Sequence, residues 1–241
     1  MVFLAFITKS NAYSGLKIDA TALFYCFIIT FSFQLINCLF LLKKSQMILP
    51  IYGYGEAVLR KICDDIDKDY PNLSEFIANM YDTMNNAHGV GLAAPQVGVP
   101  IRVFIVDTAP FSDSEDFSKE EAAALKTFKQ TFINAKILKE EGPLWGFNEG
   151  CLSIPDVRED VFRHETITLE YFDENFNKKT TMFNGIIARV IQHEYDHIEG
   201  ILFTDHISTL KRKLLSKKLN NIRDGKAHPD YRMKFANKKG R

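Results

Sequence analysis

"NGIIARVIQHEYDHIEG", residues 184–200, is the stretch from which both the fold and the chemistry of this chain can be argued. Its apolar residues recur at spacings of three and four, so the sequence predicts an amphipathic helix that stops near Gly200. His193 and His197 would lie on one face of that helix, a single turn apart. Glu194 would lie about 100° around the helix axis. This H-E-x-x-H arrangement is typical of two metal ligands and a general base.

The third metal ligand is not evident from the helix itself. A catalytic metal takes about three protein ligands and one open position. A third histidine at the spacing H-E-x-x-H-x-x-G-x-x-H is excluded, because Phe203 occupies that position. His206 comes three residues later than this pattern requires, but distance alone does not exclude it as a ligand. No glutamate follows Glu199, and the acids that remain are Asp205, Asp224 and Asp230. We therefore expect the third ligand upstream of the helix.

Cys151, within "NEGCLSIP" at residues 148–155, is one upstream candidate. It is either a thiolate ligand or a buried, inert cysteine, which is a common fate for this residue type. One Cys with two His is a softer ligand set than two His with a Glu, and it suits Zn²⁺, Fe²⁺ or another first-row metal.

A glycine-rich stretch, "GVGLAAPQVG" at residues 89–98, is a second upstream feature. Its small residues would let the backbone approach a ligand closely, and Gln96 offers an amide donor. The alternative is an ordinary turn. It is not a P-loop, since no Gly-Lys-Ser/Thr follows it.

Taken together, "GVGLAAPQ", "EGCLS" and "QHEYDH" resemble, in order, the three signature motifs of the peptide deformylase family. The resemblance covers about residues 47–210. It implies a metal-dependent hydrolase that removes the formyl group from the N-terminal formylmethionine of newly made polypeptides and releases formate. The nearest rival is a general zinc endopeptidase, and a non-enzymatic membrane-anchored or ribosome-binding module is a rival of another class.

The resemblance also implies a role for each residue that matches a motif. One metal ion would be bound by Cys151, His193 and His197. In catalysis, Glu194 would be the general base, and Gln96 and the backbone N–H of Leu152 would be the oxyanion donors. The substrate would be contacted by Gly89, Gly91 and Arg158. The metal would be Fe²⁺, for which Zn²⁺, Ni²⁺ or Co²⁺ may substitute.

Three further expectations concern the surroundings of this site. Val90, Leu152, Val190 and the stem of Arg189 would form an apolar pocket for the methionine side chain, and Asp196 would support a histidine or the local structure. His88 stands where the family often has an acid, and Ala135 stands where it usually has proline.

The rest of the sequence favours an α+β fold, with antiparallel sheets packed around the H-E-x-x-H helix and further helices near each end. Residues 71–89 predict an amphipathic helix with an Asn72–Glu75 capping box. Residues 101–107, 166–173 and 178–183 read as strands. Residues 109–122 read as an acidic surface loop, and residues 123–138 are ambiguous between helix and strand. Asn184 would cap the helix that carries the two histidines.

We expect three segments: a hydrophobic leader at 1–46, a catalytic domain at 47–210, and a basic helix and tail at 211–241. Residues 20–42 carry no charge, so the leader is either a mis-assigned start preceding Met47 or a real membrane or organelle-targeting segment. Without the leader we expect a cytoplasmic protein. With it, the protein would be organellar or membrane-tethered, and residues 20–42 would be a membrane contact.

The chain has no net charge, but its C-terminal end is basic. From Ile207 onward it has twelve Lys or Arg against two Asp. The first part of this segment can form a helix with Leu210, Leu214 and Leu215 packed inward. The charge is either a solvated face or a contact with ribosomal RNA, and we expect no DNA partner. The four cysteines include no C-x-x-C pair, so a disulfide framework is not expected.

Overall fold

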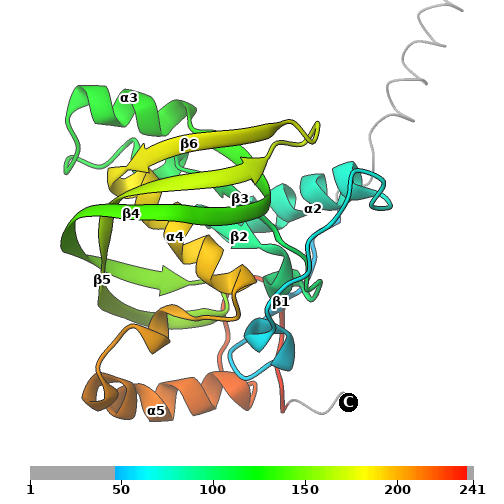
Figure 1. The fold of residues 1–241 in the computed structure, drawn as a ribbon. Coiled ribbons are helices and arrows are strands. Elements are labelled where there is room, and N and C mark those ends of the chain that lie inside the picture. Colours follow the sequence, from blue (N-terminus) through cyan, green and yellow to red (C-terminus); the bar gives the residue numbers. More distant parts are fainter. Residues whose placement is uncertain (1–46, 238–241) are drawn as a thin grey trace, which may run out of the picture. The chain divides into compact units, whose positions relative to one another are not determined.

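A computed structural model describes residues 47–237 of the chain, in which helices and strands are mixed (Figure 1). In chain order the strands and α-helices are β1 (Ile51–Tyr52), α2 (Leu73–Asn86), β2 (Gly91–Ala93), β3 (Val103–Asp107), α3 (Lys119–Thr127), β4 (Lys129–Cys151), β5 (Ile154–Phe172), β6 (Lys178–Asn184), α4 (Gly185–Ile198), α5 (Thr209–Arg223) and β7 (Met233–Lys234). Short 3-10 helices lie at η2 (Ala57–Arg60), η3 (Ala94–Val97), η4 (Ala109–Phe111) and η5 (Phe203–Asp205). The leader expected at residues 1–46 lies outside the described residues. Within 47–237, no helix has the length and apolar character needed to span a bilayer.

The main sheet has five strands in the order β2-β3-β4-β5-β6, and each strand is antiparallel to its neighbours. The pairing of β4 with β5 contains several register shifts, for example between Ile133 and Lys136 and between Glu141 and Leu144. Such irregularities bend a strand and increase its twist, so the β4–β5 ribbon is curved rather than flat (Figure 1). The expected α+β class with an antiparallel sheet is confirmed.

Helix α4 carries the histidine motif and packs against β2, β3, β5 and β6. Ala188, Ile191 and Ile198 of this helix are completely buried. The helix ends at Ile198, and Gly200 follows with a φ of 72°, which agrees with the expected stop. The expected cap at Asn184 is wrong in detail, because its side chain makes no capping hydrogen bond.

Helix α2 buries the stripe of apolar residues that its sequence predicts, including Leu73, Ile77, Met80 and Met84. The expected capping box is not formed. Asn72 takes a left-handed conformation with a φ of 56°, and its side chain makes no capping hydrogen bond. Asparagine tolerates left-handed backbone angles, so Asn72 allows the chain to turn into the helix and does not cap it with its side chain.

Residues 123–138, which were ambiguous between helix and strand, contain the end of a helix followed by the start of a strand. Helix α3 ends at Thr127, and β4 begins at Lys129. The acidic stretch before it is only partly a loop, because α3 already begins at Lys119 with a capping box between Ser118 and Glu121.

The two ends of the described chain meet in a second, small sheet. Strands β1 and β7 pair in parallel, with Ile51 opposite Met233 and Tyr52 opposite Lys234. Unlike the main sheet, this pair is not antiparallel.

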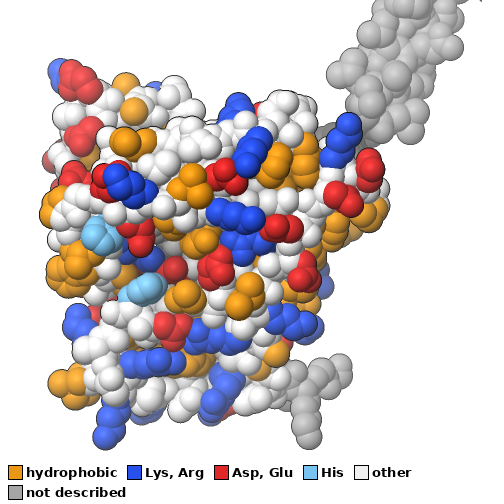
Figure 2. Space-filling model, viewed as in Figure 1, with side chains coloured by type: hydrophobic (Ala, Val, Ile, Leu, Met, Phe, Trp, Pro, Cys, Tyr) orange, Lys and Arg blue, Asp and Glu red, His pale blue; other side chains and the backbone are white. Residues whose placement is uncertain are grey.

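Helix α5 packs through Leu219 and Ile222, which are both 3% exposed. The expectation that Leu210 and Leu214 pack inward is wrong, because they are 69% and 74% exposed. Lys and Arg side chains gather over α5 along the lower edge of the molecule (Figure 2).

Candidate metal and catalytic site

Three side chains from two distant elements converge beside α4. His193 and His197 lie one helical turn apart on α4, and Cys151 is the last residue of β4. One potential ligand atom from each lies within 4.8 Å of the others, and the Cys151 Sγ is 3.2 Å from the His197 Nε2. Thiolate sulfur and imidazole nitrogen are ligands for zinc and for other first-row transition metals. The cluster therefore fits a single metal ion.

The electrostatics of this cluster favour the thiolate form of Cys151. Burial works against the charged form, but the neighbouring His197 and hydrogen bonds with both histidines lower the pKa of Cys151 to about 5. The thiolate is the form of cysteine that binds metals, so this side chain is already in its ligating state near neutral pH.

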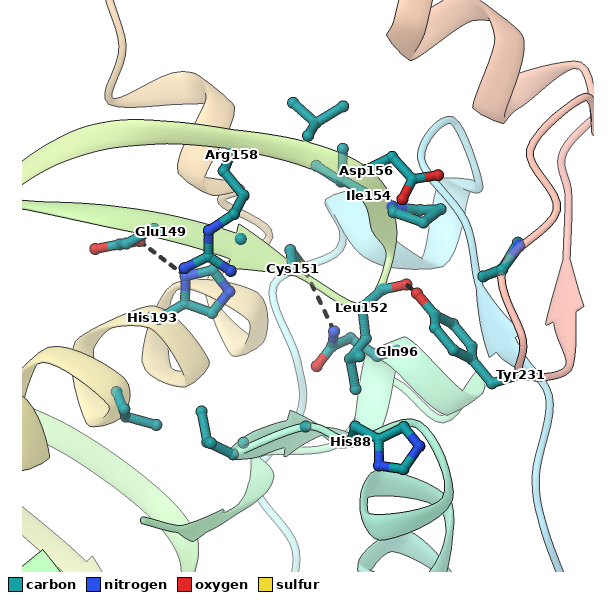
Figure 3. Close-up of a pocket in the computed structure, with 18 of the residues that line it drawn as sticks. His88, Gln96, Glu149, Cys151, Leu152, Ile154, Asp156, Arg158, His193 and Tyr231 are labelled. Atoms are coloured by element: carbon teal, nitrogen blue, oxygen red, sulfur yellow. Dashed lines mark hydrogen bonds and ion pairs between the residues drawn. The ribbon is translucent and has the colours of Figure 1, made fainter. Parts of the chain in front are cut away.

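A buried network of charges fixes the ring of His193. The His193 Nδ1 is 2.9 Å from a carboxylate oxygen of Glu149, which leaves its Nε2 for a ligand (Figure 3). Arg163 and Arg189 also donate to Glu149, and Arg163 continues to Asp196 at 2.7 Å. Burial alone would raise the pKa of Glu149, yet hydrogen bonds from His193 and Arg163 hold it well below its usual range. Such outer partners orient histidine ligands of metals.

Glu194 is buried beside the cluster and lacks a complete set of partners. Its Oε2 is buried without a hydrogen-bond partner within residues 47–237. Burial raises the pKa of Glu194 to about 7, although the two histidines act in the opposite direction. A carboxyl group with a pKa near the working pH is suited to accept and return a proton.

Gly91 leaves the space that Glu194 occupies. A Cβ built on Gly91 would lie 2.7 Å from the Glu194 Cδ, and one built on Gly89 would lie 2.8 Å from the Leu152 Cδ1. Neither glycine has a positive φ, so close approach rather than backbone freedom accounts for both.

These residues line a cleft of about 790 Å³, which also contains Gln96, Leu152 and Arg158. The Nε2 of Gln96 lies 3.2 Å from the Ser153 Oγ and 3.5 Å from the Cys151 Sγ, and its Oε1 accepts from the Ala93 N–H. Arg158 on β5 also lines the cleft (Figure 3), and it donates to the side chain and the carbonyl of Asn148. All nine residues expected to act in the site lie in or beside this cleft.

The apolar side of the cleft includes the four residues expected to receive a methionine side chain: Val90, Leu152, Arg189 and Val190. Phe111 and Phe147 add aromatic surface. Arg189 is 1% exposed and lies over the ring of Trp145, 4.3 Å from its centroid.

Comparisons with known proteins agree on one family. The family model described as polypeptide deformylase matches residues 48–213. The peptide deformylase of Flavobacterium psychrophilum is 72% identical over 193 residues, which are 80% of this chain and 100% of the relative. That of Flavobacterium johnsoniae is 68% identical over 81% of this chain and 100% of the relative.

The chain belongs to the peptide deformylase family.

Solved deformylases have the same fold. The crystal structure from Legionella pneumophila superposes with a TM-score of 0.64 at 32% identity, covering 76% of this chain and 99% of that one. The structure from Thermus thermophilus superposes with a TM-score of 0.64 at 34% identity, covering 75% of this chain and 100% of that one. Peptide deformylases are metal-dependent hydrolases that remove the N-formyl group from nascent peptides, and this is the function of the chain.

Several residues around this deformylase site escaped the sequence analysis. Glu149 stands within a motif, but nothing in its position indicated that it would hold His193. Arg163 and Tyr231 lie far from the motifs and carried no signal. Asp196, which was expected to support a histidine or the local structure, binds Arg163 and His206 through its carboxylate.

Proposed function

We propose that this deformylase holds its catalytic metal through Cys151, His193 and His197. The observation that carries the proposal is the convergence of three ligand atoms within 4.8 Å, in a cleft large enough for a peptide end. The lowered pKa of Cys151 and the hydrogen bond from His193 to Glu149 support it further. Fe²⁺ is the proposed metal, since one sulfur and two imidazole nitrogens form an electron-rich set. The same set would accept Zn²⁺, Ni²⁺ or Co²⁺.

The proposed mechanism assigns proton transfer to Glu194. When bound, the metal would supply Lewis acidity and make water a stronger nucleophile near neutral pH. The Glu194 carboxylate would take a proton from the attacking water and return it to the departing amine. Its raised pKa and its buried oxygen, which has no hydrogen-bond partner within residues 47–237, support this role.

We further propose that two donors stabilise the negative charge that develops on the formyl oxygen. These are the Nε2 of Gln96 and the backbone N–H of Leu152. Gln96 is 1% exposed and is held at its Oε1 by Ala93, so its amide is fixed before the substrate arrives. Fixed donors in a buried site stabilise such charge more than mobile ones.

The substrate would enter along the glycine-rich strand. We propose that the backbone at Gly89 and Gly91 lies against the peptide, that Arg158 faces it from β5, and that the methionine side chain occupies the apolar side of the cleft. The absence of side chains at the two glycines and the apolar lining support this placement.

The test is formate release from a formyl-Met peptide under anaerobic conditions, with metal analysis of the same sample. We expect Glu194→Gln to lose at least about 100-fold in kcat, the lower end of the range for general acid–base catalysis, while it keeps its metal. Glu165→Gln, at an exposed position on β5, is the control and should match the wild type. Full activity in Glu194→Gln would overturn the assignment.

We also propose that residues 47–210 carry the chemistry in the bacterial cytoplasm, as the bacterial relatives matched over this region suggest. The basic segment 211–241 would contact ribosomal RNA. Arg212, Lys213, Lys217 and Lys218 are exposed on α5, which supports this contact. Reversal of Lys213, Lys217 and Lys218 to Glu should abolish salt-sensitive co-sedimentation with ribosomes. Reversal of the exposed Lys68, Lys119 and Lys126 is the control, and equal effects of both triple changes would contradict the proposal.

A further inference from the structure

Leu152 and Ser153 form a tight turn that joins β4 to β5. The flanking residues Cys151 and Ile154 are paired, so the turn itself has two residues, but the next pair is Gly150 with Arg158, so the hairpin is irregular beside the turn. Two-residue hairpin turns favour types with positive φ, because those match the twist of the strands. Neither Leu152 nor Ser153 has a positive φ. The turn is therefore not of the favoured kind, and contacts from outside the hairpin would help to hold it.

Three contacts from outside the hairpin supply this restraint. The Nε2 of Gln96 donates to the Ser153 Oγ at 3.2 Å, and the backbone N–H of Tyr54 donates to the Ser153 carbonyl at 2.8 Å. The Tyr231 hydroxyl donates to the Leu152 carbonyl at 2.8 Å (Figure 3). That carbonyl belongs to the central peptide unit of the turn, whose orientation differs between turn types.

The two tyrosines reach the turn from the small sheet of β1 and β7. Tyr231 lies two residues before β7, and Tyr54 lies two residues after β1. The sheet is closed by backbone hydrogen bonds from Ile51 to Arg232 and from Gly53 to Lys234. Burial raises the pKa of Tyr231, so its hydroxyl keeps its proton and remains a donor.

We propose that Tyr231 is a positioning residue for deformylation, whose hydroxyl holds Leu152 so that the N–H of the same residue faces the formyl oxygen. The carbonyl and the N–H of Leu152 are separated by one Cα, so a restraint on the former limits rotation of the latter. This inference rests on the proposed oxyanion role of the Leu152 N–H. It gives a part in the chemistry to the C-terminal segment, which also lines the cleft through His228, Pro229 and Asp230.

The test compares Tyr231→Phe with Tyr52→Phe in the full chain, loaded with metal. Both variants lose one hydroxyl in or beside the small sheet, but the Tyr52 hydroxyl accepts from the Lys234 Nζ rather than contacting the turn. Steady-state kinetics would use formyl-Met amide and a formyl-Met tripeptide. Metal content and thermal unfolding of each variant would be measured on the same samples.

For Tyr231→Phe we expect kcat to fall about three- to tenfold, the range for one neutral hydrogen bond. KM should stay within twofold, metal content should be unchanged, and the factor should be the same for both substrates. Tyr52→Phe should retain the kcat of the wild type. A loss confined to the tripeptide or to KM would make Tyr231 a substrate contact and overturn the inference, as would unchanged kcat, loss of metal, or an equal loss in Tyr52→Phe.

A second measurement separates this inference from the proposed function. If Gln96→Leu loses kcat while Tyr231→Phe does not, the oxyanion site stands and the role of Tyr231 fails. If neither variant loses kcat, the proposed oxyanion site itself is wrong. If Tyr231→Phe unfolds at a lower temperature, kinetics well below that temperature still decide, because a change in stability alone does not lower kcat of the folded enzyme.

Discussion

The pKa values of two buried glutamates of this deformylase are shifted in opposite directions. Glu149 is surrounded by two arginines and His193, and its pKa lies well below its usual range. Glu194 has a buried oxygen without a partner in the described chain, and burial raises its pKa to about 7. The first carboxylate therefore stays charged and holds the ring of His193, while the second can exchange a proton near neutral pH.

The raised pKa of Glu194 predicts the acid side of the pH profile. A general base acts in its charged form, so activity should be present above pH 7 and should fall as the pH drops through about 7. The measurement is kcat/KM against pH, with metal content checked at each value. The charge of the bound cation would shift this midpoint downward, so a midpoint below 4.5, the value of a free glutamate, would contradict the proposed environment.

Gln96→Leu tests the proposed hydrogen bond from Gln96 to the developing oxyanion. Loss of one fixed donor to a developing oxyanion lowers kcat by about 100- to 1000-fold in enzymes where it has been measured. We expect a fall of this size with KM changed only a few fold. Gln130→Leu, which removes a hydrogen bond to Tyr171 elsewhere in the fold, is the control. A change in KM alone would exclude the oxyanion role.

Gly91→Ala tests the close approach of the glycine-rich strand to Glu194. The added methyl group would lie within 2.7 Å of the Glu194 Cδ, so the carboxylate must move. We expect kcat/KM to fall by more than about tenfold, since small displacements of catalytic groups are costly. Gly146→Ala should be tolerated, because its Cβ meets only the exposed ring of Phe162 at 3.3 Å. Equal activity of both variants would show that the space at Gly91 is not needed.

At the scale of elements, the helix and strands that make the site were predictable because each has a strong local pattern. The H-E-x-x-H helix and the stripe of α2 follow from their 3.6-residue period, and β3 from its apolar run. The metal ligands that we propose follow from the three motifs, and the structure brings Cys151, His193 and His197 together.

What the sequence could not supply were the contacts between elements. Glu149, Arg163 and Asp196 come from β4, β5 and α4, and no local pattern links them. The inward packing expected of Leu210 and Leu214 failed for a similar reason, because α5 packs through Leu219 and Ile222 near its other end. Helical period alone does not say which part of a helix meets the core.

Arg163→Met tests the importance of this buried charge network. It would leave Glu149 and Asp196 charged and short of partners, because Arg163 bridges them at 2.7 Å to each. Breaking a buried pair in this way lowers the free energy of unfolding by about 3–5 kcal/mol. Lys178→Met, which removes an exposed pair with Glu170, should change it by less than about 1 kcal/mol. The free energy of unfolding would be measured with urea at neutral pH. A decrease of less than about 1 kcal/mol in Arg163→Met would contradict the buried charge network.

At the scale of the whole molecule, the C-terminal segment does more than extend a catalytic domain. After α5 the chain returns to pair with β1, and Phe235 joins a core cluster with Leu59, Ile154 and Leu219. The basic composition of this segment indicated a surface helix and tail. Composition could not indicate the return strand, because β7 is only two residues long and its pairing partner lies about 180 residues away.

The central claim is that a cysteine at the end of β4 completes a metal site begun by two histidines of α4. The most direct measurement is metal content per chain together with formate release for Cys151→Ser, beside Cys63→Ser as the control. Cys63 is buried outside the cleft, and burial raises the pKa of its thiol to about 11. The account predicts loss of metal and turnover in Cys151→Ser and wild-type values in Cys63→Ser. Full metal content and turnover in Cys151→Ser would contradict it.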